Sequence, residues 1–253
     1  MNPFVAAQEF SMKGQFWGSI QTSDDIPVGE ASLEYTIGYI PTFSLYKDLN
    51  ENSFVDMEFS VQSQRMYSGD FLTNNIEKFH RYWFRYSTEK LEARLGMQKI
   101  IFGPSQVLRS LSWFDTFSLT DPTGQTDGVE AFRIKWFPSN FLSAWSWGII
   151  NTQDTLSYGG RLEISTNRGE WGLTYHHDPS SSIQPLGQSN IPIAGPQNRL
   201  AIDYRYDGFI GLWNESAIIR ANDFELEMIM IGADYTLPIA TGILVMMESM
   251  LIS

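Results

Sequence analysis

Arginine and lysine recur at every second position in several segments of this 253-residue chain. In one of them, Arg81 and Arg85 alternate with the aromatic residues Tyr82, Phe84 and Tyr86. A row of fixed positive charges attracts small anions through its local field, whereas a carboxylate on a neighbouring strand would bind it in an ion pair. These residues therefore point to electrostatic recognition of solutes.

Other kinds of chemistry find little support. His176, His177 and Asp178 have the residue types of a metal site, but adjacent residues of a strand point to opposite faces and cannot easily share one ion. No Gly-x-Ser-x-Gly segment is present, and His80 has no evident catalytic partner. We expect no catalytic residues, no cofactor and no metal, and hence no enzyme.

The same alternation indicates which charged residues share a face. If the apolar faces of the segments meet lipid, the opposite face carries eight of the 17 basic residues. We interpret this face as the lining of a pore formed by Arg81, Arg85, Glu92, Arg94, Arg133, Lys135, Arg161, Glu163, Arg199, Asp203 and Arg205. The alternative is that these charges pair across strands: a two-residue turn at Thr88-Glu89 would set Arg85 opposite Glu92.

Alternation of apolar and polar residues with a period of two gives such faces only in β-strands. From Gln15 onward about thirteen segments of roughly ten residues alternate apolar and polar positions between turn residues. Short connections alternate with longer ones along the chain, which is typical of an up-and-down antiparallel meander. Strands of roughly 9 to 11 residues can span a bilayer when tilted, so the pattern predicts an all-β, antiparallel, up-and-down transmembrane β-barrel. A soluble β-sandwich also alternates and is the competing fold.

The composition excludes several classes of protein and several kinds of site. No stretch reaches the roughly 18 to 20 consecutive apolar residues of a membrane-spanning helix. The net charge of −12 argues against a nucleic-acid partner, which requires a basic face. The chain has no cysteine, so it contains neither disulfides nor cysteine-based zinc sites.

The longest connection, from Ile101 to Asp127, mixes apolar and charged residues. Connections beyond about 12 to 15 residues without their own structure are usually functional or disordered. We hypothesise that this one folds into the barrel and narrows the pore, with Arg109, Trp113, Asp115 and Asp121 as its constriction residues. A cap packed on the outer rim is the alternative.

Residues 1–253 are interpreted as a single barrel domain. Single-chain bacterial barrels have an even number of strands, so about 13 strands predict a fragment of a barrel with 14 to 18. On this interpretation the C-terminal strands and a signal peptide are missing.

The stretch from His80 to Phe137 resembles Gram-negative outer-membrane porin-like channels, including the alginate-export type. The resemblance lies in Arg94-Leu95-Gly96-Met97-Gln98 with Gly103, followed after a long loop by Asp127-Gly128-Val129. It covers under a quarter of the chain at the level of motifs.

The resemblance implies a barrel in the bacterial outer membrane that lets small hydrophilic solutes diffuse through it. The basic residues of the predicted lining would somewhat favour anions. Its partners would be outer-membrane lipid and small polar solutes, and a homo-oligomer is allowed. The alternative function is a non-conducting barrel with a structural or surface-polysaccharide assembly role.

Overall fold

A computed structural model describes residues 8–24, 31–115, 121, 123–150, 154–181, 183–186, 191–222, 224–239 and 241–253 of the chain. All regular secondary structure in this part is β-strand. Thirteen strands form one antiparallel sheet, and two short strands form a separate pair. No helix of the described residues is long and apolar enough to cross a membrane.

The strands of the large sheet pair with their neighbours in chain order. They are β1 (Gln8–Thr22), β2 (Leu33–Asn50), β3 (Ser53–Ser68), β4 (Phe71–Thr88), β5 (Leu91–Gln98), β6 (Val129–Ser139), β7 (Leu142–Ile150), β8 (Leu156–Thr166), β9 (Gly169–Asp178), β12 (Gln197–Asp207), β13 (Gly211–Ala221), β14 (Phe224–Leu237) and β15 (Ile243–Ile252). The strands β10 (Ile183–Leu186) and β11 (Ile191–Ala194) pair with each other between β9 and β12. The predicted all-β, up-and-down order with about thirteen strands is confirmed.

Alternating burial shows that the sheet has an apolar outer face. In β9, Leu173 and Tyr175 are exposed whereas Thr174 and His176 are buried. The same alternation runs through β12, where Leu200 and its second neighbours face outward. Because successive side chains of a strand point to opposite faces, the period-two sequence pattern places aliphatic and aromatic residues outside and charged residues inside.

Two turns set strand registers that could not be read from the sequence or that differ from the register predicted there. Asp207 pairs with Gly211, so a three-residue turn at 208–210 joins β12 to β13. The turn between β4 and β5 lies one residue later than expected, which places Ser87 opposite Glu92. Arg85 is consequently opposite Arg94 rather than Glu92.

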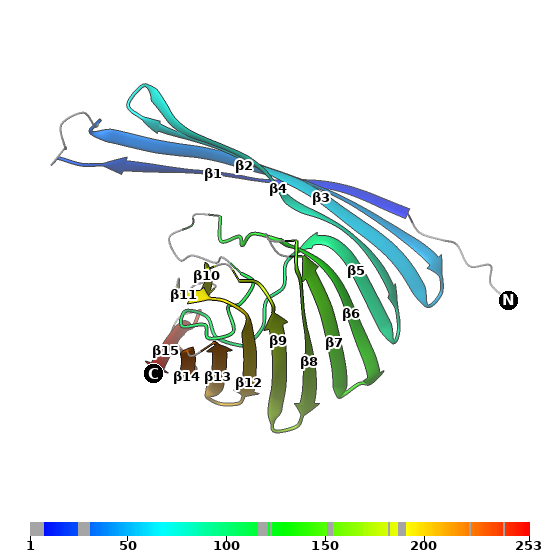
Figure 1. The fold of residues 1–253 in the computed structure, drawn as a ribbon. Coiled ribbons are helices and arrows are strands. Elements are labelled where there is room, and N and C mark those ends of the chain that lie inside the picture. The colour runs from blue at the N-terminus through cyan, green and yellow to red at the C-terminus, as the bar shows by residue number, and fades with distance from the viewer. Residues whose placement is uncertain are drawn as a thin grey trace.

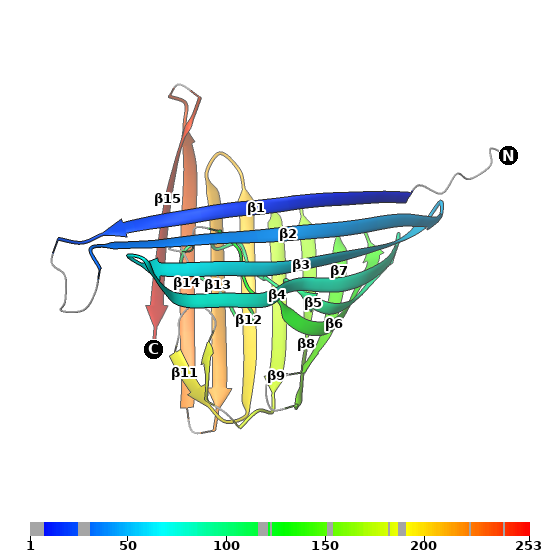
Figure 2. The same ribbon diagram turned by 90° about the horizontal axis from the view of Figure 1, so that it is seen from above.

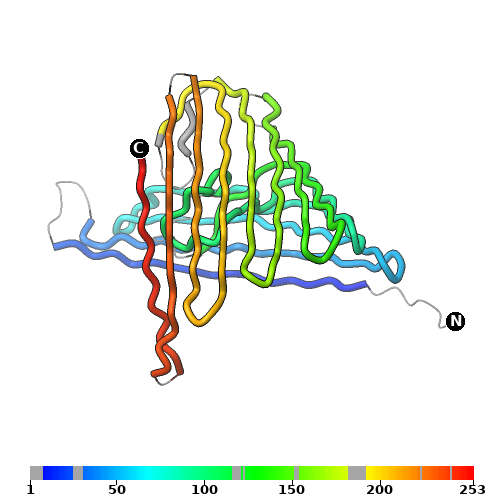
Figure 3. The backbone as a smooth tube through the Cα atoms, turned by 90° about the horizontal axis from the view of Figure 1, so that it is seen from below, coloured from blue at the N-terminus to red at the C-terminus, as the bar shows by residue number. Residues whose placement is uncertain are grey.

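The sheet curls around an interior. Strands β1 to β4 form a long layer across one side, and β5 to β15 curve beneath it (Figure 1). The two edge strands, β1 and β15, cross at a steep angle (Figure 2), and β12 to β15 run side by side down the wall opposite β5 (Figure 3). No pairing joins β1 to β15 within the described residues.

The described part of the connection between β5 and β6, residues 99–115, 121 and 123–128, lies on the concave side of the sheet together with β10 and β11 (Figure 1). We call residues 99–128 the inner link. Its described part makes contacts with both edges of the sheet and with the wall between them, so it determines which parts of the interior are filled.

Candidate functional site

Two carboxylates hold the inner link against the wall. Glu248 on β15 accepts hydrogen bonds from three consecutive backbone N–H groups, those of residues 106–108, at 2.8, 2.9 and 2.7 Å. The buried Glu215 on β13 accepts hydrogen bonds from the backbone N–H groups of Ser105 and Leu111 at 2.8 and 3.2 Å. Hydrogen bonds to a charged acceptor are stronger than neutral ones, so these two side chains fix the path of the link.

The far end of the link is attached to β1. The Gln15 amide donates to the carbonyl oxygen of Thr123 at 2.8 Å, and the Gln125 amide donates to the side-chain oxygen of Gln15 at 3.2 Å. The link therefore crosses the interior from β15 to β1, the two edge strands.

Apolar packing fills the side of the interior between the link and the opposite wall. The rings of Phe102 and Trp147 lie 5.0 Å apart, and Phe114 meets His176 edge-on at 4.8 Å. Leu111 and Trp113 of the link belong to the same buried cluster, to which the wall contributes Trp147, Ile149, Ala201, Ala217, Ile219, Leu226 and Met228. Close packing of this kind leaves no aqueous path through the cluster.

A buried charge cluster lies on the wall beneath the link. Arg161 donates to both carboxylate oxygens of Asp203, at 2.6 and 3.0 Å, to Glu163 at 2.8 Å and to the Thr174 hydroxyl at 2.7 Å. Arg161 also lies over the Phe102 ring, at 5.5 Å. These three predicted residues face inward, and the single positive charge of Arg161 lies between the two carboxylates.

A second cluster joins β3 to β6. Arg85 donates to Asp56 at 2.8 and 2.6 Å and to Glu92 at 3.3 Å. The ion pair between Arg85 and Glu92 therefore forms, although the shifted turn makes the two residues diagonal neighbours rather than directly opposite. Glu92 also accepts a hydrogen bond from Arg133 at 2.8 Å and lies 3.6 Å from Arg94. The Glu92 carboxylate thus lies within ion-pair distance of three guanidinium groups, those of Arg85, Arg94 and Arg133.

Of the remaining predicted wall residues, Lys135 lies between the two clusters, whereas Arg199 and Arg205 have other partners. Lys135 sits over the Trp145 ring at 3.4 Å, and Arg205 pairs with Asp207 at 2.8 Å. Arg199 is buried, donating to the Gln197 side chain at 3.0 Å. The charged residues predicted for the wall are therefore distributed among several environments rather than gathered in one site.

The four residues predicted for the constriction have mainly internal contacts. Arg109 and Asp115 form a buried ion pair at 2.9 Å. Trp113 is in the apolar cluster, and Asp121 accepts hydrogen bonds from the backbone N–H and hydroxyl of Thr123, at 2.8 and 2.7 Å. Their contacts stabilise the shape of the link.

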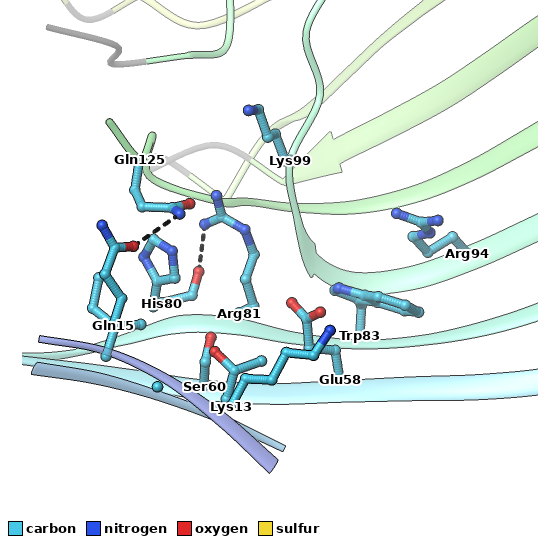
Figure 4. Close-up of a pocket in the computed structure, with 13 residues that line it drawn as sticks. Lys13, Gln15, Glu58, Ser60, His80, Arg81, Trp83, Arg94, Lys99 and Gln125 are labelled. Carbon is cyan, nitrogen blue, oxygen red and sulfur yellow. Dashed lines mark hydrogen bonds between the residues drawn. The ribbon is translucent and has the colours of Figure 1, made fainter. Parts of the chain in front are cut away.

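A cavity of about 440 Å³ opens on the other side of the link, against β1 to β5 (Figure 4). Four cationic side chains and one carboxylate line it: Lys13, Arg81, Arg94, Lys99 and Glu58. The structure thus brings together two predicted arginines from β4 and β5. Burial, together with the neighbouring Arg81 charge, lowers the pKa of Lys99 from its ordinary value.

Arg81 forms part of the cavity floor. It is buried, and its two terminal nitrogens donate to the backbone carbonyl oxygens of His80 and Thr126, each at 2.5 Å. Carbonyl oxygens orient a guanidinium group without cancelling its charge. The charge of Arg81 therefore contributes to the potential in the cavity.

Sequence reasoning missed four residues of this interior: Lys13, Lys99, Glu215 and Glu248. Glu248 offers a signal, because it is the only charged residue of the largely apolar strand β15. Glu215 could not be assigned to a face while the length of the turn after Asp207 was open. The roles of Lys13 and Lys99 depend on the path of the inner link, which no local pattern reveals.

His176 and His177 lie on opposite faces of β9, as their adjacency predicts. His176 is buried and accepts a hydrogen bond from the Trp147 indole at 3.3 Å. In the described part of the chain, no group of three or more histidine, aspartate or glutamate side chains could hold a metal ion.

No protein-family model and no curated protein matches the sequence. Solved structures do match the fold. A Salmonella typhi OmpF in complex with daunomycin is 10% identical, with a TM-score of 0.61 over 97% of this chain and 78% of that one. A loop L8 deletion mutant of OmpT, an outer-membrane protein of Vibrio cholerae, is 9% identical, with a TM-score of 0.53 over 98% and 82%. The trimer form of OmpT is 8% identical, with a TM-score of 0.50 over 98% and 79%. The chain therefore has the barrel fold of the Gram-negative outer-membrane porins.

Proposed function

We propose that this protein is a channel of the bacterial outer membrane that lets small hydrophilic solutes diffuse through it, with a preference for anions. The observation that carries the proposal is the division of the interior by the inner link. Apolar side chains fill the side toward β7 and β12 to β14, whereas a polar cavity remains against β1 to β5. A solute path along the cavity is polar on both sides.

The outer face supports the location in a membrane. Large apolar side chains such as Phe84, Leu95, Phe132 and Leu173 are exposed there, which would be costly in water over a whole sheet. In lipid they are the expected outer surface of a barrel. We infer that lipid surrounds this face.

The lining supports the preference for anions. Four cationic side chains and one carboxylate face the cavity, although the chain as a whole carries a net charge of −12. Basic side chains around a pore favour anionic solutes through their field. The inner link forms one side of this path, so we infer that it narrows the pore.

The test is single-channel recording of the natural full-length protein, refolded in detergent and inserted in a planar bilayer. We expect stable open channels with a larger permeability for chloride than for potassium. Channels that prefer potassium would contradict the anion preference, and a folded barrel that carries no current would contradict the channel.

The apolar cluster favours a second function, that of a non-conducting barrel with a structural or surface-polysaccharide assembly role. Fourteen buried apolar residues lie in one cluster inside the sheet, more than a wide water-filled pore requires. Absence of current from a correctly folded barrel would favour this function over the channel.

We further propose that the barrel associates with copies of itself, as the trimer form of OmpT does. Asn214 and Ser216 interrupt the apolar outer face of β13, where the Asn214 amide bonds the Met230 carbonyl oxygen at 2.8 Å and the Ser216 hydroxyl at 3.2 Å. Polar side chains facing lipid are costly, so contact with another subunit is the better environment for them.

Replacing Asn214 with leucine is therefore expected to weaken the oligomer, because a polar contact between subunits is lost. The measurement is the fraction of oligomer on native electrophoresis in mild detergent. The matched control is Ser146→Leu, at an outward-facing position of β7. Equal oligomer fractions for the two variants would place the interface elsewhere.

A further inference from the structure

We propose that the outer face of β12 to β14 binds one zwitterionic phospholipid that has a primary ammonium group. Its phosphate lies on Arg220 and Asn198, its ammonium group on Glu227, and one acyl chain in a hollow between the strands. The site is on the side of the sheet that meets lipid. The inference therefore goes beyond the proposed channel and does not depend on whether the interior conducts.

A row of polar side chains crosses the outer face near the ends of four strands that are consecutive in the sheet (Figure 3). His177 on β9 is opposite Asn198 on β12. Asn198 is in turn opposite Arg220 on β13, and Arg220 is opposite Glu225 on β14. Further along the same face the side chains become mainly apolar, beginning with Leu200 on β12. A polar row that borders an apolar face marks the level where lipid headgroups meet the acyl chains.

This row leaves hydrogen-bond donors free for an anionic group. Arg220 donates through its Nε to Glu225, and in the described part of the chain its two terminal nitrogens have no partner. The side-chain oxygen of Asn198 accepts a hydrogen bond from the Tyr175 hydroxyl at 2.8 Å, whereas the amide nitrogen of Asn198 has no partner among the described residues. Opposite residues on adjacent strands have Cβ atoms about 5 Å apart, so Arg220 and Asn198 can reach one phosphate together.

Glu227 lies on the same face, two residues beyond Glu225 and one step further into the apolar side. It is exposed and opposite Ile218 on β13, and within the described residues its carboxylate has no hydrogen bond and no ion pair. A carboxylate without a partner is costly next to lipid. Arg220 already pairs with Glu225. The primary ammonium group of a lipid supplies the missing positive charge and three donors, as the ammonium group of a lysine does.

Glu227 also lines an apolar hollow of about 240 Å³ on the outer face between β9 and β14. Ser216 on β13 is opposite Ile202 on β12 and Ile229 on β14. Because serine is smaller than the isoleucines on both sides of it, the face is hollowed there. A hydrocarbon chain that fills the hollow gains van der Waals contacts. The other outward side chains of its lining are aliphatic: Leu173, Leu200 and Ile218.

The charges of the site determine the class of lipid. Arg220 supplies one positive charge, and Glu225 and Glu227 supply two negative ones. A purely anionic headgroup meets more negative than positive charge here. A headgroup with both a phosphate and an ammonium group finds an opposite charge for each of them. A quaternary ammonium group has no N–H to donate to Glu227, so a primary one is the better match.

The lipid can lie at the edge of the contact between copies that we propose at Asn214. On β13, Asn214 is six residues from Arg220, which at the rise of a β-strand is roughly 20 Å. The headgroup site is therefore outside that contact. Only the end of the hollow at Ser216 adjoins it.

The experiment measures lipid binding to the natural full-length protein, refolded in detergent and freed of lipid, by native mass spectrometry. The probes are phosphatidylethanolamine and phosphatidylglycerol with the same acyl chains. We expect one molecule of phosphatidylethanolamine to bind saturably and at least about tenfold more tightly than phosphatidylglycerol, a difference of roughly 1.4 kcal/mol. Glu227→Gln removes the charge that holds the ammonium group and should abolish this preference. Arg220→Gln should weaken the binding of both lipids, because both carry a phosphate.

The matched control is Glu77→Gln, which removes an exposed carboxylate from β4 that does not line the hollow. It should leave both affinities unchanged. Equal binding of the two lipids to the natural protein, binding without saturation, or an unchanged preference in Glu227→Gln would overturn the site. None of these outcomes bears on the channel, which the conductance of the same protein tests separately.

Discussion

Replacing Arg161 with leucine is expected to lower the free energy of unfolding by about 3–5 kcal/mol, because it leaves the carboxylate of Asp203 buried without its partner. Both side chains are almost inaccessible, with 6% and 8% of their surfaces exposed, and two hydrogen bonds join them. The measurement is urea unfolding of the barrel in lipid vesicles.

A second substitution separates the charge from the packing. In the double variant Arg161→Leu, Asp203→Leu the uncompensated carboxylate is gone, so most of the lost stability should return. Arg205→Leu is the matched control: its pair with Asp207 is exposed and should contribute only about 0–1 kcal/mol. If the double variant is no more stable than Arg161→Leu, packing of the guanidinium group on Phe102 is the larger contribution.

Replacing Glu248 with leucine is expected to release the inner link from the wall. Three backbone N–H groups, those of residues 106–108, lose their shared acceptor, and each hydrogen bond to a charged group contributes about 1.5–3 kcal/mol. A protease specific for arginine and lysine should then cut after Arg109 at least about tenfold faster. If the link narrows the path as proposed, single-channel conductance should also rise and fluctuate.

The control for this substitution is Glu227→Leu, which removes an exposed carboxylate from the outer face of β14. It should change neither the cleavage rate nor the conductance. Cleavage after Arg109 at the natural rate in Glu248→Leu would mean that Glu215 and the apolar cluster hold the link without help from β15.

The parts of the fold that depend on local pattern were predictable. The face on which a side chain lies follows from a period of two, so the inward position of Arg85 and the outward position of Phe84 could be assigned from their own segment. The number and order of strands followed from the alternation of short and long connections. Registers were less certain, because a turn that shifts by one residue changes every opposite pair, as at Arg85 and Glu92.

The cavity could not be predicted because it arises from contacts between segments distant in sequence. Lys13 and Lys99 share it only because the inner link crosses the interior to meet Gln15 on β1. The division of the charged residues into neutralised and accessible ones likewise depends on pairs such as Arg161 with Asp203, which lie 42 positions apart. A facing pattern indicates that a residue is inside but not what it touches there.

The attachment of the inner link to both edge strands has a consequence for the order of folding. Its hydrogen bonds join residues 108 positions apart at Gln15 and 142 positions apart at Glu248. Contacts of such high sequence separation form slowly, because the entropy of a long closed loop is lost before they form. The link can dock only after the sheet has curled, and until then Phe102, Leu111 and Trp113 are exposed to water.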